Sequence, residues 1–411
     1  MRLRHFTLSL LAAACTVQAA DLDAAIQNNR TGTLVIQARP GAKVQVEQVR
    51  HEFWFGATVP TGMFTGRMSA ENAAKFNEVF ASHFNAGVIE ASFKWHDMER
   101  ERGVVNYSTV DAMLRWADKA GIPLRGHCIY WGVPNRVQEW LKELSDADLR
   151  VELRQRGRSI GARYRGRFAE YDLNNEMIHA NYYEQRLGEG ITKEMAQWVK
   201  DGDPDARLFV NDYDITTGNR LDDYVKHIRK LLEMGVPLAG IGVQGHLHGD
   251  TFDAAALQNA LDVLAQFKLP VRITEFNFPG QRSKYYRDKE ARTAQLTAEE
   301  EQAKAVALRE FYRICFAHPA VTGIMMWGFW EGANWIPQSS LYRRDWTPTP
   351  AAGAYQDLVL KQWWTRWSGT TDTKGRAETR AFFGKYRVTV DGREMMVELK
   401  RTEGTKTVKA E

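Results

Sequence analysis

The chain is short of cysteine, of long apolar runs and of charge of one sign. It has 3 cysteines, and two isolated ones, Cys128 and Cys315, do not make a disulfide framework. Both lie in apolar stretches, so we expect buried free thiols. Beyond the N-terminus no stretch is apolar for the roughly 18 residues that a membrane span requires. The 55 basic and 51 acidic residues are interleaved without a long run of one sign, which gives nucleic-acid binding no support.

Residues 1–20 have the pattern of a secretion signal. Arg2 and Arg4 precede an apolar run from Phe6 to Ala14, and small residues follow, with cleavage expected after Ala19. We therefore expect a secreted or periplasmic protein. A lipoprotein anchored at Cys15 is the alternative, but the residue three positions before that cysteine is Ala12 and not the usual leucine.

Nucleotide-binding loops are also missing. No G-x-G-x-x-G or Walker sequence follows any apolar run, which counts against an open doubly wound sheet. Instead, short apolar runs alternate with amphipathic helical patterns, as in a parallel (β/α)₈ barrel. The expected strands are Phe53–Ala57, Ala86–Glu90, Pro123–His127, Ala169–Leu173, Leu208–Asn211, Gly240–Gln244, Val271–Glu275 and Gly323–Trp327. Helices are expected at Tyr107–Ala120, Leu149–Tyr164, Asp222–Met234, Ala254–Phe267, Glu299–Phe316 and, last, about Ala351–Trp363.

Both ends of the chain show β patterns outside this alternation. We predict a signal peptide at 1–20, an N-terminal hairpin segment at 21–50, the barrel at 51–365 and a C-terminal β extension at 366–411. The hairpin strands fall within 31–49, a turn-rich linker at 368–372 and a second hairpin at about 382–400, followed by a polar tail expected to fray.

An isolated two-stranded hairpin is marginal in water, so the two hairpins are expected to pack together as one small β layer beside the barrel. The shared apolar face would be made by Val35, Val44, Val46, Phe382, Tyr386 and Val388. Separate flaps on opposite sides of the barrel are the alternative.

Two glutamates close predicted barrel strands: Glu176 in YDLNNEM and Glu275 in VRITEFN. Reactive groups of such barrels sit at the C-terminal ends of the strands. Two carboxyl groups that face each other are the minimal equipment for hydrolysing a glycosidic bond. A single glutamate at a strand end is more often a solvated loop residue, so the surroundings must decide.

Polar and aromatic residues follow the other strand ends and suit a neutral polyhydroxylated ligand. The chain has 13 tryptophans, and aromatic faces can cover the apolar faces of sugar rings. Taken singly, His127 could be a core histidine, and Trp327 and Trp335 could be core packing. The candidates are Glu90, Lys94, His127, Trp131, Asn175, Gln244, His246, Trp327 and Trp335, with Asn211, Asp212 and Tyr213 after the fifth strand.

A metal site is the alternative use of the histidines. His246 and His248 would point to the same side of a strand, and Asp212 is a further candidate ligand. Hydrolytic metal sites need more ligands at other strand ends, and no third histidine stands there beyond His127. We expect neither a metal nor another cofactor.

These motifs, in this order, resemble glycoside hydrolase family 10, the β-1,4-xylanase family. The matching stretches are FKW (93–95), RGH (125–127), DLNNE (172–176), LFVNDYD (208–214), GIGVQGH (240–246), ITEFN (273–277) and MMWGFWEGANW (325–335). The flanks, HEFWFGATVP and WWTRWSGTTD…RAFFGKY, are similar to the branch typified by plant xylanases. The resemblance implies that Glu176 is the acid/base and Glu275 the nucleophile. It also implies a sugar site lined by Lys94, His127, Asn175, Gln244, His246, Trp327 and Trp335, with Glu90 and Trp131 nearby.

Three positions depart from the family pattern. Ala91 stands where the family has an asparagine that binds a hydroxyl of the neighbouring sugar on the non-reducing side. Gly132 stands where histidine or glutamate is usual. Asn277 replaces the acid that normally orients the histidine equivalent to His246.

The resemblance implies a secreted endo-β-1,4-xylanase, expected to be a monomer, that retains the anomeric configuration of its substrate xylan. Retention requires carboxyl groups about 5–5.5 Å apart. Two alternatives remain: an enzyme for another β-glycan or a decorated xylan, and a barrel that binds β-glycans without useful turnover, which the three departures suggest.

Overall fold

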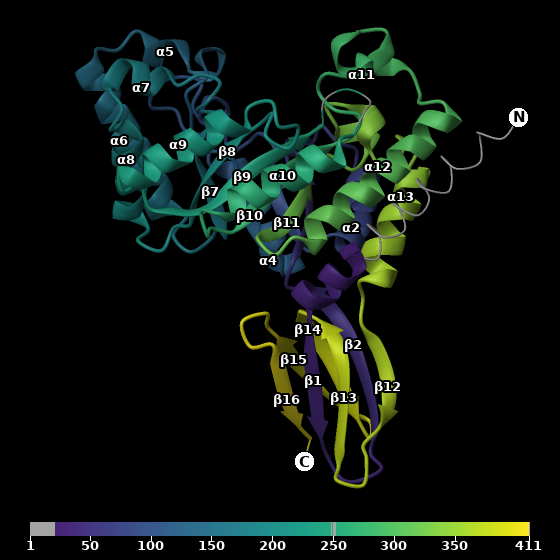
Figure 1. The fold of residues 1–411 in the computed structure, drawn as a ribbon. Helices are drawn as coiled ribbons and strands as arrows, with labels where there is room; N and C mark the ends of the chain where they lie inside the picture. Colours follow the sequence, from purple (N-terminus) through teal and green to yellow (C-terminus); the bar gives the residue numbers. More distant parts are fainter. Residues whose placement is uncertain (1–20, 248, 250–251, 411) are drawn as a thin grey trace, which may run out of the picture. The chain divides into compact units, whose positions relative to one another are not determined.

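The computed structural model describes residues 21–247, 249 and 252–410. The secretion signal, Cys15 and His248 therefore lie outside the described residues. The chain forms two compact units (Figure 1). The larger comprises Trp54–Leu308 and Ala320–Ala354, and the smaller comprises the N-terminal segment up to Phe53, Arg309–Pro319 and the segment from Tyr355 onwards.

The larger unit is a closed parallel barrel. Its strands are ordered β5-β4-β3-β11-β10-β9-β8-β7, and β5 pairs with β7 to close the ring. The predicted (β/α)₈ barrel is confirmed, and each predicted strand is found within a few residues of its expected place. The strands are β3 (Trp54–Val59), β4 (Ala86–Ile89), β5 (Leu124–Gly126), β7 (Glu170–Asn175), β8 (Leu208–Asp212), β9 (Leu238–His246), β10 (Val271–Asn277) and β11 (Val321–Met326), with the short β6 (Tyr130–Trp131) beside β7.

The barrel strands are buried along nearly their whole length, because helices cover their outer side and side chains fill the interior. The helices are α2 (Ala70–His83), α3 (Trp95–Met98), α4 (Ser108–Ala120), α5 (Glu139–Lys142), α6 (Asp146–Arg163), α7 (Tyr182–Leu187), α8 (Ile191–Gly202), α9 (Leu221–Glu233), α10 (Ala254–Ala265), α11 (Lys284–Arg287), α12 (Ala298–Ala317) and α13 (Pro350–Tyr355). Shorter turns are η1 (Thr61–Met63), η2 (Pro134–Arg136), η3 (Ala291–Thr293), η4 (Glu331–Ala333) and η5 (Pro337–Ser339), and the π-helix η6 (Gln356–Gln362) continues α13.

Local sequence explains where several helices begin and end. Ser69 and Ser145 cap α2 and α6, each accepting a hydrogen bond from a backbone N–H of the first turn. Asp253 does the same for α10. Gly121 ends α4 with a φ of 64°, a left-handed conformation that glycine adopts without steric cost.

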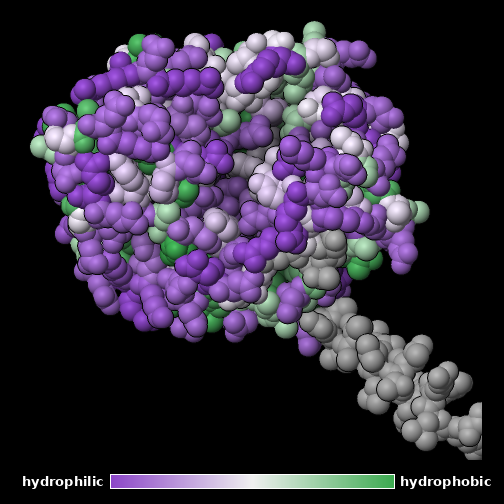
Figure 2. Space-filling model, turned by 90° about the horizontal axis from the view of Figure 1, so that it is seen from above, coloured by the Kyte–Doolittle hydropathy of each residue, from purple (hydrophilic) through white to green (hydrophobic). Residues whose placement is uncertain are grey.

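None of the helices in the described part of the chain combines the length and the apolar character that crossing a membrane requires. Cys128 and Cys315 are both buried and free, as expected. Figure 2 shows one face of the molecule, where mainly hydrophilic residues surround a hollow near the middle.

The smaller unit carries two sheets. One has the order β13-β1-β16 and the other β12-β2-β14-β15. The strands are β1 (Thr31–Gln37), β2 (Lys43–His51), β12 (Arg366–Thr370), β13 (Arg376–Phe382), β14 (Gly384–Val390), β15 (Arg393–Leu399) and β16 (Thr405–Lys409). Residues 21–30, before β1, are helical.

The N-terminal strands do not form the hairpin that the sequence suggested. β1 pairs with β13 and β16, and β2 pairs with β12 and β14, so the turn between them carries the chain from one sheet to the other. The C-terminal hairpin is present, with β14 and β15 joined at Asp391-Gly392. Two segments were expected to be irregular and are strands: β12 covers part of the supposed linker, and β16 lies in the supposed frayed tail. Both are short and half-exposed, so their own sequence carries little apolar pattern.

The two chain ends share one apolar core, which confirms that they pack together. Val44, Val46, Tyr386 and Val388 belong to this core as expected. On β1, however, the inward residues are Leu34 and Ile36, whereas Val35 and Phe382 are buried without belonging to the cluster. Alternation along a strand explains the difference, because a shift of one residue moves a side chain to the other face.

The core position of Tyr386 can be tested by mutation. Tyr386→Ala should destabilise the smaller unit by about 3–5 kcal/mol, because it leaves a cavity in the core shared by both sheets. Lys385→Ala, at the exposed neighbouring position, is the matched control and should stay within about 0.5 kcal/mol of the parent. Thermal and urea unfolding would measure both, and equal effects would contradict the shared core.

Candidate active site

The structure places every candidate residue at the C-terminal ends of barrel strands or just beyond them. Gln244, His246 and Glu275 lie within the last residues of β9 and β10. Asn175 ends β7, and Trp131 ends β6. The remaining candidates follow strands in the chain: Glu90 and Lys94 after β4, His127 after β5, Glu176 after β7, and Trp327 and Trp335 after β11.

Glu176 is held in an unusual backbone conformation. Its φ is 60°, a left-handed value that costs a residue with a side chain about 1–3 kcal/mol. The surrounding hydrogen bonds hold it there: the Glu176 N–H donates to the carbonyl of Asn211 at 2.9 Å, and its own carbonyl accepts from His179 at 3.1 Å. The turn directs the Glu176 side chain to the barrel mouth. There the indole N–H of Trp131 donates to Glu176 Oε2 and the amide of Gln244 donates to Oε1, both at 3.0 Å.

The environment raises the pKa of Glu176 to about 7. Burial is the main cause, because the charged form loses hydration. The negative charges of Glu275 and Asp212 raise the pKa further, while the hydrogen bonds from Gln244 and Trp131 oppose the shift. A carboxyl group with this pKa holds its proton over much of the neutral range and can deliver it.

Glu275 is shifted in the opposite direction. Burial alone would raise its pKa, but the hydrogen bond with His246, the charges of the two nearby histidines and that of Lys94 together lower it. His246 Nε2 lies 2.9 Å from Glu275 Oε2, and the Asn211 amide donates to Glu275 Oε1 at 3.2 Å. His127 Nε2 lies 3.9 Å from that same oxygen. Glu275 is therefore held ionised, as a nucleophile must be.

Asn277 determines how His246 is oriented. The Asn277 amide nitrogen donates to Ser339 and to the carbonyl of Trp327, at 2.7 and 3.1 Å. These bonds turn the Asn277 oxygen toward His246 Nδ1, 2.9 Å away. That oxygen can only accept, so Nδ1 carries a proton. A neutral amide thus keeps the orientation that a carboxylate would give.

A buried ion network orients His127. Asp172 Oδ2 lies 2.8 Å from His127 Nδ1, so this nitrogen donates and Nε2 faces the site. Arg125 donates to Asp172 and, at 2.8 Å, to Glu170. All of these side chains are almost fully buried. His127 is therefore a hydrogen-bonded core histidine on one side and a site residue on the other.

Aromatic rings and one lysine complete the walls. Lys94 Nζ lies 5.0 Å from the ring centroid of Trp131 and 5.8 Å from that of Trp327, and both rings stabilise its charge. Trp327 is buried and packs with core residues as well as facing His127. Trp335 is half-buried, and its indole N–H donates to the Asn277 oxygen at 2.8 Å. The core-packing interpretation thus holds in part for both tryptophans, because Trp335 packs against the core cluster to which Trp327 belongs.

Asn175 offers a buried donor without a partner among the described residues. Its oxygen accepts from the Asn211 amide at 2.9 Å, whereas its Nδ2 is buried and makes no hydrogen bond to the described part of the chain. A buried donor of this kind costs free energy unless a ligand satisfies it. A sugar hydroxyl beside Glu176 would do so.

Asn211, which the sequence offered only as a polar residue after the fifth strand, is a member of the site. It bonds to Glu275 and Asn175 as described, and accepts from the Thr274 hydroxyl at 2.6 Å. The available signal was its place at the end of the fifth strand. Its role became visible only when the strands were brought together, because Asn175 and Glu275 are far from it in the sequence.

Gly132 sits under a neighbouring loop. A Cβ atom at this position would lie 3.1 Å from the Tyr183 ring and 3.2 Å from the Asn181 oxygen, which is tighter than ordinary contact. The Gly132 carbonyl also accepts the N–H of Tyr182 at 2.8 Å. The segment at 181–183 thus occupies the space that a larger residue would use.

The metal hypothesis gains no support from the described part of the chain, where no group of three or more histidine, cysteine, aspartate or glutamate side chains is placed to hold an ion. His248 lies outside it. What the site contains is a protonated carboxyl group, an ionised one and a set of neutral donors, which together suit acid-assisted nucleophilic displacement.

The sequence and the fold are similar to those of known proteins. The model of glycosyl hydrolase family 10 matches residues 48–358. The chain is 35% identical over 350 residues to the anti-sigma-I factor RsgI6 of Acetivibrio thermocellus, covering 85% of this chain and 42% of that protein. It is 33% identical over 354 residues to endo-1,4-beta-xylanase 1 of Arabidopsis thaliana, covering 85% and 34%. Native xylanase 10B from Thermotoga maritima has a similar fold, with a TM-score of 0.65 and 23% identity over 76% of this chain and 96% of that one.

The chain spans less than half the length of the first two relatives. The expected likeness to plant xylanases is confirmed by the Arabidopsis protein. The family match extends across the barrel and includes Glu176, Glu275 and all the candidate residues around them. The chain therefore belongs to glycosyl hydrolase family 10.

Proposed function

We propose that this protein is a retaining endo-β-1,4-xylanase. The observation that carries the proposal is the opposite tuning of two carboxyl groups in one site: the pKa of Glu176 is raised to about 7, and that of Glu275 is lowered. Pairs tuned in this way divide the roles of acid and nucleophile between them. Family membership and the likeness to an Arabidopsis protein named endo-1,4-beta-xylanase support xylan as the substrate.

In the first step, Glu275 attacks the anomeric carbon of the sugar while Glu176 gives its proton to the leaving glycosidic oxygen. The bond to the leaving sugar breaks, and a glycosyl–Glu275 ester forms. The hydrogen bonds from His246 and Asn211 keep Glu275 ionised and hold it in place before attack.

In the second step, Glu176 is ionised and takes a proton from water, which then attacks the anomeric carbon and releases Glu275. The loss of negative charge at Glu275 helps Glu176 to change from an acid in the first step to a base in the second. Once Glu275 is esterified, its negative charge no longer raises the pKa of Glu176. Asn175 Nδ2 would hold a hydroxyl of the reacting sugar through both steps.

We also propose that the protein is exported and acts as a monomer. Export is supported by the sequence pattern of residues 1–20, and a polysaccharide substrate is too large to enter a cell. Expression of the full chain, with N-terminal sequencing of the secreted product, would test cleavage after Ala19. Retention in the cell envelope with lipid at Cys15 would favour the lipoprotein alternative, and light scattering of the mature protein would test the monomer.

The pH dependence of kcat/KM should be bell-shaped. Activity requires protonated Glu176, so the alkaline limb should fall as the pH rises through about 7. It also requires ionised Glu275, so the acid limb should lie below the ordinary range of glutamate, whose reference pKa is 4.5. Initial rates on a soluble xylo-oligosaccharide across the pH range would measure both limbs.

Trp131→Phe should move the alkaline limb to higher pH. It removes an indole donor that lowers the pKa of Glu176 and keeps an aromatic ring in place. Trp116→Phe is the matched control, because the Trp116 indole donates to Asn77 and not to either catalytic carboxyl group. A limb that shifts equally in both variants, or in neither, would contradict the assignment.

Removing each carboxyl group should have a different result. Glu275→Ala should lower activity by several orders of magnitude, with azide restoring turnover and yielding an α-glycosyl azide. Glu176→Ala should retain the first step on aryl glycosides with activated leaving groups, because these need no proton. Glu143→Ala, on the surface, is the control. If both active-site variants behave alike on aryl glycosides, the assigned roles are wrong.

The reaction should retain the anomeric configuration. Proton NMR during the first minutes of xylo-oligosaccharide hydrolysis should show the β-anomer appearing before mutarotation. An initial α-anomer would contradict a double displacement and would require water in place of Glu275 as the attacking group. A panel of xylans and other β-glycans, run in parallel, would distinguish a xylanase from an enzyme for another β-glycan and from a binding protein without turnover.

A further inference from the structure

A large cavity lies beside the active site. It has a volume of about 930 Å³ and is formed by three segments, those after β3, β4 and β11. Neither Glu176 nor Glu275 lines it. Glu90 does, and the charge of Lys94 acts on both Glu90 and Glu275. The cavity is therefore next to the catalytic centre and of the size that ligand pockets have, roughly 300–1,000 Å³.

Ala91 lines the cavity at a position that bears on the substrate. The family pattern has an asparagine here, which binds a hydroxyl of the sugar next to the reacting one on the non-reducing side. The alanine methyl group can make no such hydrogen bond, and it leaves more room. Next to the position of this sugar, the protein therefore has open space where the family pattern has a hydrogen bond from asparagine to a sugar hydroxyl.

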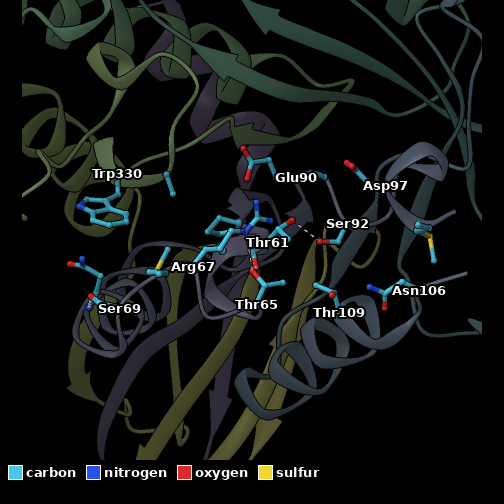
Figure 3. A pocket seen from close by; sticks show the side chains of 18 of the residues that line it. Thr61, Thr65, Arg67, Ser69, Glu90, Ser92, Asp97, Asn106, Thr109 and Trp330 are labelled. Carbon is cyan, nitrogen blue, oxygen red and sulfur yellow. Dashed lines mark hydrogen bonds between the residues drawn. The ribbon is translucent and has the colours of Figure 1, made fainter. Parts of the chain in front are cut away.

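Arginine side chains are among the polar residues that line the cavity. Figure 3 shows Arg67 beside Thr61, between Trp330 and Ser92. Its Nε donates to the Thr65 hydroxyl at 3.2 Å, and within the described chain Arg67 makes no ion pair. An exposed guanidinium in this state has donors left for a bidentate contact with a carboxylate.

The charges of the lining residues leave cationic groups available. Asp97 is paired with Arg100, 3.3 Å apart. Burial raises the pKa of Glu90, and the charges of Lys94 and Arg67 oppose that shift. Among the other described lining residues, Arg344 makes no ion pair and Glu101 is the carboxylate that remains. Three arginines and three carboxyl residues line the cavity, so neither sign of charge is in excess, and Arg67 and Arg344 are the two arginines of this lining without an ion pair to a described residue.

One wall of the cavity is rigid. Trp330 is buried, and its ring stacks on that of Trp346 with centroids 4.6 Å apart and planes at 4°. The Trp346 indole is fixed in turn by a hydrogen bond to Asn72 at 2.9 Å. The remaining walls carry hydroxyl groups, such as those of Thr61 and Ser92, which lie 2.6 Å apart. A rigid apolar wall opposite hydroxyls and a guanidinium suits a sugar ring that bears a carboxylate.

We propose that this cavity receives a uronic acid branch of the substrate, carried by the sugar next to the reacting one on the non-reducing side. Arg67 binds the carboxylate of the branch, and Ala91 provides the space through which the branch leaves the main chain. This inference rests on the proposed xylanase function and specifies the substrate as an acidic, decorated xylan.

The test compares three substrates with the full-length protein: linear xylohexaose, a xylan with glucuronic acid branches and a xylan with neutral arabinose branches. The glucuronic acid substrate should have the highest kcat/KM. Its shortest acidic product should carry the uronic acid on the second sugar from the new reducing end, as read by mass spectrometry of the fragmented product. Products with the uronic acid at other positions only would overturn the proposal.

Two variants probe the cavity directly. Arg67→Ala should lower the ratio of kcat/KM on the acidic substrate to that on xylohexaose by about tenfold, the effect of losing one charge-assisted contact. Ala91→Asn should lower the same ratio by refilling the space. Arg229→Ala, which removes an exposed arginine of α9, is the matched control and should leave the ratio unchanged.

The outcomes separate this inference from the function on which it rests. Turnover of xylohexaose with no preference for the acidic branch, or with a ratio that Arg67→Ala leaves unchanged, would overturn the cavity assignment and leave the xylanase intact. A preference for arabinose branches would replace the acidic ligand with a neutral one and also overturn it. Failure to hydrolyse any xylan would contradict the proposed function itself.

Discussion

The hydrogen bond between His246 and Glu275 is the interaction on which the chemistry of this site depends. It offsets the cost of burying the Glu275 charge and so keeps this carboxyl group ionised. The negative charge then acts, together with burial, to raise the pKa of Glu176. The pKa of Glu176 therefore depends on the charge of Glu275, which His246, His127 and Lys94 stabilise. The barrel makes this possible because His246 and Glu275 lie at the ends of the paired neighbouring strands β9 and β10.

Beneath the site, the barrel interior contains buried charged side chains in addition to apolar ones. Arg125, Glu170, Asp172 and Arg272 are buried and joined by hydrogen bonds. Removing one partner of such a network leaves an uncompensated charge, so its members are mutually dependent. The network ends at His127, which faces Glu275. Its clearest consequence is positional, since it fixes the tautomer and the direction of a histidine in the active site.

The three departures from the family pattern are accommodated in different ways. Asn277 preserves the orientation of His246 with a neutral amide, because Ser339 and the Trp327 carbonyl fix which way the amide points. Gly132 is matched by the segment at 181–183, which lies close against it. Ala91 is not compensated and borders open space. The first two therefore preserve the site, and the third changes the shape of the region that faces the substrate.

The sequence by itself determined the barrel, its eight strands and the strand-end positions of Glu176 and Glu275, because alternating apolar runs and helical patterns are local properties. It also indicated that the two ends of the chain share a core. Tertiary structure decided which strands pair: β1 and β2 belong to different sheets, and β16 joins β1 across most of the chain, because backbone hydrogen bonds between distant segments leave little trace in either sequence. It likewise revealed Asn211 as a link between Asn175 and Glu275. The pKa values of the two glutamates were decided there too, since burial and neighbouring charge exist only once the strands have met.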